Sequence, residues 1–393
     1  VESALTAGFI AAGMDVMLLG PVPTPAIALL VRSMRADLGV MISASHNPYQ
    51  DNGIKFFGLN GCKLPPEIQA SIEKRVAENN LPYARAEDLG RAKHLEDTHG
   101  RYIEFLKQTF PKKCRLDGLK IVVDCAHGAA YKIAPMILWE LGADVIPIGV
   151  QPNGRNINEN CGATCPATVS VMVQEHQADL GLALDGDGDR LIIADRTGRI
   201  LNGDRILAYL ATYWKKMAVL QNDIVVGTVQ SNGALEQYLN SINVAFKRTS
   251  VGDRFVTQAM QATRSNLGGE SSGHIICSSY LSTGDGLLAA LQCLAVMQVQ
   301  DVDVAEVFAL YEDIPSVTKS YKMQHKKHLF SLESVQTYLK SCQEDFASKG
   351  RILIRPSGTE ALIRILVESP NIDDNNAVAS HILEYLQQQD CSV

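Results

Sequence analysis

The stretch that decides the fold lies at residues 180–190 and has the sequence LGLALDGDGDR. Its first half, Leu180–Leu184, contains no polar side chain, which predicts a strand buried on both faces of a parallel or mixed sheet. Its second half, Asp185–Arg190, alternates carboxylates with glycines. Because ligands of open α/β sheets bind in loops beyond the carboxyl ends of strands, we expect this loop to belong to a functional site.

Apolar strands and amphipathic helices alternate on both sides of this stretch. We expect helices over residues 3–12, 26–34, 103–110, 131–141 and 235–239, and strands over residues 15–19, 38–42, 119–124, 144–148, 223–228 and 244–247. This alternation predicts α/β domains whose mixed sheets are covered by helices on both faces. After residue 315 the pattern changes to strands over 351–354 and 361–367 and a helix over 373–388, which predicts a smaller α+β domain.

Polar stretches between these groups mark the expected domain boundaries. One seam is expected between residues 86 and 113 and a second near residues 202–213. We therefore expect three tandem α/β mixed-sheet domains and a smaller C-terminal α+β domain around a central cleft, with the boundaries 1–112, 113–209, 210–318 and 319–393.

Composition excludes several classes of protein. Of the 393 residues, 36 are Lys or Arg and 43 are Asp or Glu, which gives a net charge of −7, and the basic residues are scattered, so no nucleic-acid partner is expected. The longest apolar stretches are shorter than a membrane span, so no membrane partner is expected either. Nine cysteines at irregular spacings indicate reduced thiols in the cytoplasm. No signal peptide is visible at Val1.

The aspartate loop predicts a metal site. Asp185, Asp187 and Asp189 would repel one another, but the intervening glycines let the backbone turn tightly enough for all three carboxylates to meet a hard divalent cation such as Mg²⁺. An EF-hand is excluded because Arg190 and Arg196 occupy the loop positions that require Gly and a carboxylate. A solvated acidic turn is the remaining alternative.

A second polar loop, Ser43–Pro48, follows the strand expected over residues 38–42. Ser45 in this loop suits a nucleophilic or phosphate-carrying role, with His46 and Lys55 nearby to handle charge and protons. The alternative interpretation is an ordinary turn, because Ser, Asn and Pro are common turn residues.

Two further loops carry groups that bind sugars and phosphates. In Gly268–His274, the side chains of Glu270, Ser272 and His274 are able to hydrogen-bond a polyol, and a flexible Gly/Ser loop is the alternative. In the loop 355–360, Arg355, Ser357, Gly358 and Thr359 suit a phosphate dianion, and a turn between two strands is the alternative. Neither GxxxxGK[ST] nor GxGxxG occurs in the chain, so nucleotide-binding folds gain no support.

One such loop in each expected domain, in this order, resembles the α-D-phosphohexomutase superfamily over essentially the whole chain. Within the superfamily, the chain most resembles a bacterial branch that acts on hexosamine phosphates. The resemblance to that branch rests on DNGIKFF at Asp51–Phe57, on Asp124–Ala129, on Asn156–Asn158 with Cys161-Gly162, and on Gly269–Ile275.

The resemblance implies an isomerase that exchanges the 6- and 1-phosphates of a hexosamine, a step toward UDP-N-acetylglucosamine and cell-wall precursors. It implies a phosphoserine at Ser45 that also contributes an oxygen to Mg²⁺, a cationic contact from Arg190, and a sugar bisphosphate as activator. Lys55 and His274 match the positions that exchange protons with the sugar. The loop with Arg355 would hold the phosphate that does not react, and Glu270 and Ser272 would hold the sugar hydroxyls. Whether the chain forms a homodimer is left open by the sequence.

The family also predicts what this chain lacks. Its members begin with a strand, a loop that contributes an active-site arginine, and a second strand, and this sequence begins after both. We therefore expect a first domain truncated at its start, an exposed sheet edge and reduced activity. A metal-dependent phosphatase, an inactive sugar-phosphate-binding fragment, and phosphomannomutase or phosphoglucomutase activity remain as alternatives.

Overall fold

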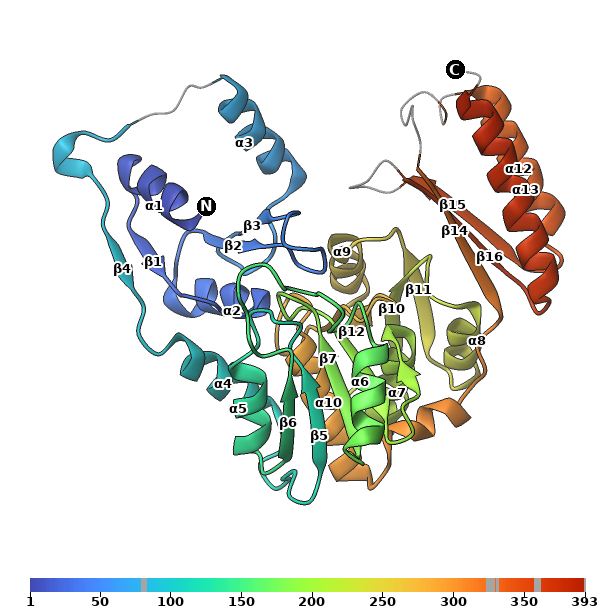
Figure 1. The fold of residues 1–393 in the computed structure, drawn as a ribbon, viewed down its shortest axis with the longest axis horizontal. Helices are drawn as coiled ribbons and strands as arrows, with labels where there is room; N and C mark the ends of the chain where they lie inside the picture. Colours follow the sequence, from blue (N-terminus) through green and yellow to red (C-terminus); the bar gives the residue numbers. More distant parts are fainter. Residues whose placement is uncertain (79–82, 323–328, 330–331, 357–361, 392–393) are drawn as a thin grey trace. The chain divides into compact units, whose positions relative to one another are not determined.

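The computed structural model describes residues 1–78, 83–322, 329, 332–356 and 362–391. The chain forms two compact units, Val1–Thr228 with Leu239–Leu310, and Val229–Tyr238 with Tyr311–Val393. Of the sheets formed by the described strands, four belong to the first unit and one, a three-stranded sheet, belongs to the second (Figure 1). The three expected α/β domains therefore lie together in one unit, and the expected α+β domain accounts for most of the other.

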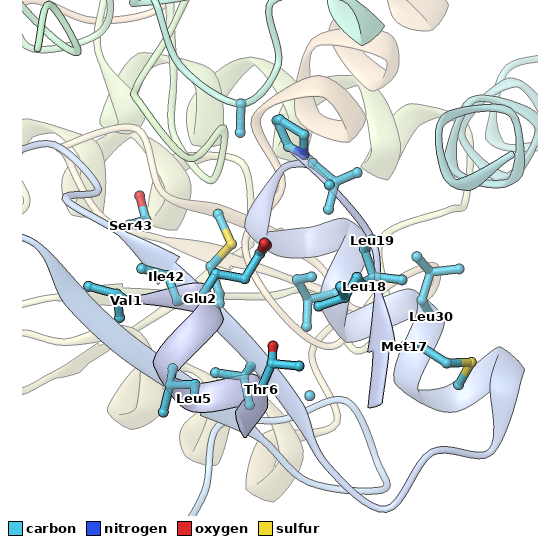
Figure 2. Close-up of a pocket in the computed structure, with 18 of the residues that line it drawn as sticks. Val1, Glu2, Leu5, Thr6, Met17, Leu18, Leu19, Leu30, Ile42 and Ser43 are labelled. Carbon is cyan, nitrogen blue, oxygen red and sulfur yellow. The ribbon is translucent and has the colours of Figure 1, made fainter. Parts of the chain in front are cut away.

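The N-terminal part of the first unit contains two separate two-stranded sheets. Its elements are α1 (Glu2–Ala11), β1 (Val16–Leu18), α2 (Thr24–Met34), β2 (Gly39–Ser43), β3 (Gly53–Phe57), α3 (Pro66–Glu78), η1 (Ala86–Asp88), β4 (Ala92–His94) and α4 (Thr98–Thr109). Strand β1 pairs in parallel with β4, and β2 pairs antiparallel with β3. A cavity of about 1020 Å³ is lined by α1, β1, α2 and β2, and Figure 2 shows apolar side chains around it, among them Leu18, Leu30 and Ile42.

The middle part of the first unit is a five-stranded mixed sheet. Its elements are β5 (Lys120–Asp124), α5 (Ile133–Glu140), β6 (Asp144–Ile148), α6 (Ala167–Glu175), β7 (Leu180–Leu184), β8 (Leu191–Asp195) and β9 (Ile200–Leu201). The strand order is β6-β5-β7-β8-β9, with β5 parallel to β6 and β7, and β8 antiparallel to β7. Every residue of β7 and β8 is buried, as the apolar run Leu180–Leu184 predicts.

The last part of the first unit is a four-stranded sheet with the order β11-β10-β12-β13. Its elements are α7 (Gly203–Lys216), β10 (Ile224–Thr228), β11 (Ala245–Thr249), α9 (Asp253–Thr263), β12 (Leu267–Gly269), β13 (Ile275–Cys277), α10 (Gly286–Gln300) and η2 (Val304–Ala309). Helix α8 (Gly233–Ser241) begins in the segment Val229–Tyr238 of the second unit and ends in the first. Helix α10 is apolar on all sides because it packs against α4, α7, β8 and β13, and its residues Gly286–Val296 are buried. The expected seam at residues 202–213 falls largely within α7, so the boundary at 209/210 stays a prediction.

The second unit is an antiparallel sheet with two helices. Its elements are β14 (Ser316–Lys322), α12 (Glu333–Phe346), β15 (Arg351–Pro356), β16 (Leu362–Glu368) and α13 (Ile372–Cys391), and the strand order is β14-β16-β15. Both helices lie on one side of the sheet (Figure 1), where they bury an apolar core that includes Leu339, Ile365 and Ile382. This arrangement confirms the expected α+β architecture.

One buried ion pair ties the segment Val229–Tyr238 to the strands of the second unit. Arg351 donates from Nε to Glu368 Oε1 at 2.7 Å and from Nη1 to the Val229 carbonyl at 2.9 Å. Glu368 Oε1 also accepts from the Gly233 amide at 3.0 Å. Glu368 is buried, so its charge requires these donors.

Among the described residues, no helix is both long and apolar enough to cross a bilayer. The cysteines between Cys62 and Cys342 are free thiols.

Candidate active site

The serine loop joins β2 to β3 in an antiparallel hairpin. The Asn47 amide donates to the Ala44 carbonyl at 2.9 Å, which closes a turn with Ser45 and His46 at its centre. Ser45 has φ +54°, in the left-handed region that a residue with a side chain occupies only when the surroundings hold it there. The Ser45 amide donates to Ser43 Oγ at 2.8 Å, which supports this conformation.

Lys55, on β3, connects the serine loop to the aspartate loop. Its Nζ lies 3.5 Å from Ser45 Oγ, 2.5 Å from Asp187 Oδ2 and 3.4 Å from Asp189 Oδ2. Burial opposes the charge of Lys55, but the neighbouring carboxylates of Asp189 and Asp187 outweigh it and raise the pKa of the amine. Lys55 therefore places a positive charge between the serine hydroxyl and the aspartates.

The three aspartates converge, as the alternation with glycine predicts. Ligand atoms from Asp185, Asp187 and Asp189 all lie within 4.8 Å of one another, and the three residues are buried. Gly188 has φ +72°, and its amide donates to the Asp185 carbonyl at 3.0 Å, so the loop turns back on itself here. Thr24 Oγ1 also donates to Asp187 Oδ2, a contact that brings the N-terminus of α2 to the triad.

The triad fits a hard divalent cation. Asp185 Oδ2 and Asp187 Oδ1 are buried and accept no hydrogen bond from the described residues. Carboxylate oxygens left without donors in a buried, like-charged cluster are the ligand set that Mg²⁺ or a similar cation satisfies. A merely solvated acidic turn, the alternative from the sequence, does not account for this burial.

The neighbours of each aspartate set its pKa. Burial, followed by the charges of Asp189 and Asp187, raises the pKa of Asp185 well above its ordinary value. Asp189 is also buried, but Lys55, His274 and Arg190 supply positive charge and hold its pKa well below the ordinary value. Arg190 also contacts Asp185, to which its amide donates at 3.1 Å.

His274 reaches the triad from the four-stranded sheet. It lies directly before β13, with Nδ1 3.5 Å from Asp189 Oδ1. A Cβ on Gly284 would lie 2.3 Å from Nε2, so the imidazole requires glycine at that position. Burial opposes protonation, but Asp189 and Asp253 raise the pKa of His274. In the same loop, Glu270 Oε1 accepts from the Gly252 amide at 3.0 Å, and Ser272 is partly buried.

The remaining predicted residues lie elsewhere. His46 is exposed and borders a separate pocket of about 210 Å³ with Arg155 and Glu159. Arg355 lies on β15 of the second unit, directly opposite Arg364 on β16. Ser357, Gly358 and Thr359 lie outside the described residues.

The sequence analysis assigned no role to three residues that the structure brings to this site, although Asn158 belongs to one of the motifs that carry the resemblance. Lys63 Nζ pairs with Asp253 Oδ2 at 2.5 Å, and Asp253 Oδ2 lies 4.0 Å from His274 Nε2. Asn158 donates to two carbonyls of the serine loop. Asp253 lies in the loop region after the carboxyl end of a strand, where ligands of open α/β sheets bind, so the sequence could have identified it. No feature of the sequence around Lys63 indicates a role at the site. The cavity in Figure 2 is not lined by the aspartates, Lys55 or His274, so volume alone does not locate the chemistry.

Family models match the whole organisation of the chain. The models of the four phosphoglucomutase/phosphomannomutase domains match the chain in order. The α/β/α domain I matches residues 1–82, domain II matches 100–198, domain III matches 202–314, and the C-terminal domain matches 317–384. The chain belongs to the phosphoglucomutase/phosphomannomutase family, within the α-D-phosphohexomutase superfamily. It is therefore an enzyme of the phosphohexomutase type, and the expected fold class is confirmed.

Curated relatives in this family are similar over nearly the full chain. The chain is 50% identical over 385 residues to a phosphoglucosamine mutase of Methylobacterium radiotolerans, covering 98% of this chain and 86% of the relative. It is 50% identical over 388 residues to that of Zymomonas mobilis, covering 99% of this chain and 87% of the relative.

Solved structures share the fold at low sequence identity. A phosphoglucomutase/phosphomannomutase family protein of Burkholderia thailandensis superimposes with a TM-score of 0.80 at 22% identity, over 99% of this chain and 85% of the other. An N-acetylphosphoglucosamine mutase of Aspergillus fumigatus, in complex with GlcNAc-6P and magnesium, superimposes with a TM-score of 0.73 at 18% identity, over 99% of each chain.

Proposed function

We propose that this phosphohexomutase interconverts glucosamine 6-phosphate and glucosamine 1-phosphate. Support for the substrate comes from the curated phosphoglucosamine mutases at 50% identity. The observation that carries the chemistry is the position of Lys55, whose Nζ lies 3.5 Å from Ser45 Oγ and contacts Asp187 and Asp189. A serine hydroxyl beside a fixed cation and a carboxylate triad suits phosphoryl transfer, which depends on positioning and charge neutralisation.

The proposed reaction begins with Ser45 phosphorylated. The bond between Ser45 Oγ and phosphorus breaks as a sugar hydroxyl oxygen bonds to phosphorus. The hydroxyl proton passes to a basic group of the site, and the departing Ser45 Oγ takes up a proton from an acidic one. The sugar bisphosphate then reorients and returns its other phosphoryl group to Ser45, which restores the starting enzyme. Lys55, whose raised pKa keeps it protonated and whose Nζ lies 3.5 Å from Ser45 Oγ, would give its proton to the departing oxygen. Lys55, once it has lost that proton, or His274 would exchange the proton of the sugar hydroxyl.

Asp185, Asp187 and Asp189, together with a phosphate oxygen on Ser45, would hold Mg²⁺, which when bound neutralises charge on the transferring phosphoryl group. Arg190 adds a second positive charge. A sugar bisphosphate would phosphorylate Ser45 in enzyme that has lost its phosphate. A glucose 1,6-bisphosphate complex of an Aspergillus fumigatus N-acetylphosphoglucosamine mutase, which has a TM-score of 0.70 at 19% identity, supports this role.

The sugar would be held by residues of two loops. Glu270 and Ser272 would hydrogen-bond its hydroxyls in either orientation, and Arg355 would hold the phosphate that does not react, with Ser357, Gly358 and Thr359 of the same loop. His46 would act at the edge of the serine loop as a neutral imidazole, because partial burial and the neighbouring Arg190 lower its pKa.

The test is turnover of glucosamine 6-phosphate beside glucose 1-phosphate and mannose 1-phosphate, each with Mg²⁺ and glucose 1,6-bisphosphate. Ser45→Ala provides the blank. We expect turnover that prefers the glucosamine substrate and disappears in Ser45→Ala. A preference for glucose or mannose phosphates would assign the chain to another branch of the family. Binding without turnover on any of the three sugars would contradict the proposal.

A further inference from the structure

Asn158 crosses from the five-stranded sheet domain to the serine loop. Its Nδ2 donates to the Ser45 carbonyl at 2.8 Å and to the Asn47 carbonyl at 2.8 Å. The backbone N–H of Asn158 donates to the Ala126 carbonyl at 2.9 Å, which anchors Asn158 to the loop after β5. Both hydrogens of one carboxamide group are therefore used to hold the two ends of the turn that contains Ser45.

The carbonyl that Asn158 holds lies directly against the aspartate loop. A Cβ on Gly186 would lie 2.5 Å from the Ser45 carbonyl oxygen and 2.5 Å from Cδ1 of Ile157. Three segments are therefore closely packed here: the serine turn, the loop that carries Ile157 and Asn158, and the aspartate loop. A side chain on Gly186 would not fit between them. Since Ser45 also has a left-handed backbone, its position requires contacts from outside its own hairpin.

We propose that Asn158 is a positioning residue that clamps the serine turn against the aspartate loop and so fixes Ser45 Oγ for phosphoryl transfer. The catalytic part of this inference rests on the function proposed above for Ser45. Only a carboxamide meets the requirement, because a carboxylate of the same shape has no hydrogens to donate. Asparagine also suits the left-handed backbone of this residue, which has φ +59°, but only its two N–H groups hold the serine turn.

The test compares Asn158→Asp with Asn156→Asp. At residue 158 the change replaces two donated hydrogen bonds with a carboxylate facing two carbonyl oxygens. At residue 156 the same change, with the same added charge, affects a side chain that bonds within its own loop, where Nδ2 donates to the Gln151 carbonyl at 3.0 Å. The side-chain hydrogen bonds of Asn156 in the described structure join it to Gln151 and Asn153 and not to the serine turn, so it is a matched control.

For Asn158→Asp we expect kcat to fall about a hundredfold with KM changed less than threefold, because a displacement of about 1 Å at a reacting group costs this much. We expect phosphorylation of Ser45 by glucose 1,6-bisphosphate to slow by the same factor. Asn156→Asp should keep kcat within about twofold of the unmodified enzyme. Asn158→Ala, which adds no charge, provides the second variant if Asn158→Asp fails to fold.

Amide hydrogen exchange of residues 43–52 tests whether Asn158 holds the serine turn, and it does so independently of turnover. We expect faster exchange in this peptide in the Asn158 variants than in Asn156→Asp, with exchange in β7 unchanged. If the serine turn exchanges at the same rate in the Asn158 variants and in Asn156→Asp, Asn158 does not clamp it, whatever the activity. If the unmodified enzyme shows Ser45-dependent turnover and the Asn158 variants have the same kcat, Asn158 does not contribute to catalysis. If the unmodified chain has no such turnover, the proposed function fails, and exchange still decides the clamp.

Discussion

Asp285 provides a sharp test of how burial and hydrogen bonding set the stability of the first unit. It is the N-cap of α10, where Oδ1 accepts from the Leu288 amide at 2.9 Å, and Oδ2 accepts from Tyr102 Oη at 2.7 Å. The residue is fully buried. The change Asp285→Asn keeps the size and both contacts, since Asn Oδ1 accepts from Leu288 and Asn Nδ2 donates to Tyr102. It removes the charge and the titration and reverses the direction of the Tyr102 hydrogen bond, and this last difference does not depend on pH.

The magnitude follows from the pKa of Asp285, which burial raises from 3.8 to about 6 despite the hydrogen bonds from Leu288 and Tyr102. Between these pH values the folded chain keeps a proton that the unfolded chain has lost. The stability of the wild-type unit therefore falls as pH rises from about 4 to about 6 and stays lowered above that range. A shift of about two pH units corresponds to about 3 kcal/mol.

Relative to the wild type, Asp285→Asn should gain free energy of unfolding as pH rises. About 2 kcal/mol of this gain falls between pH 4.5 and 7, since each pH unit in the window contributes about 1.4 kcal/mol. Urea unfolding followed by tryptophan fluorescence measures it for the right unit, because the chain has 2 tryptophans and both, Trp139 and Trp214, lie in the first unit.

Asp301→Asn, at the exposed C-cap of the same helix, serves as the control and should run parallel to the wild type across this pH range. If the curve of Asp285→Asn is also parallel to the wild-type curve within about 0.5 kcal/mol, or if its relative stability falls with rising pH, the raised pKa is wrong.

Three further changes test other contacts. Gly186→Ala should lower kcat at least a hundredfold, because its Cβ would lie 2.5 Å from the Ser45 carbonyl oxygen, and steady-state kinetics with a metal-binding titration checks this. Arg355→Ala should raise KM for the sugar phosphate at least tenfold with little change in kcat, and an unchanged KM would contradict its proposed role. Arg351→Ala should destabilise the second unit by about 2–4 kcal/mol, since it leaves the buried Glu368 carboxylate without its cation. Faster proteolysis of residues 311–391, with an unchanged tryptophan transition, checks this last prediction.

Local patterns predicted the elements well where one physical cause dominates. Leu180–Leu184 and Asp144–Ile148 form strands with the predicted bounds, because a short apolar or β-branched run has few other uses. The convergence of the aspartates was predictable for a related reason. Alternating glycines let the backbone turn tightly, and like-charged carboxylates brought together in this way are stabilised by a bound cation.

Contacts between distant segments were not predictable in the same way. The pairing of Lys63 with Asp253 joins residues 190 positions apart, and no local pattern relates them. Asn158 was visible as part of a motif, but its role depends on where the serine turn docks. The seam expected near residues 202–213 proved to be helical, because Asn202 is an N-cap whose side chain accepts from the Arg205 amide. A polar residue at this point starts a helix as readily as it marks a boundary.

The charges of the site also explain why three α/β domains form one unit. Asp185 and Asp189 are both buried in the same loop, yet the pKa of the first is raised and that of the second lowered. The difference lies in the cations around Asp189, which come from three places: Lys55 from the hairpin, Arg190 from the aspartate loop, and His274 from the four-stranded sheet. Lys55 and His274 therefore bring positive charge to Asp189 from two elements outside the aspartate loop. The groups proposed for phosphoryl transfer therefore also make ion pairs between the hairpin, the aspartate loop and the four-stranded sheet.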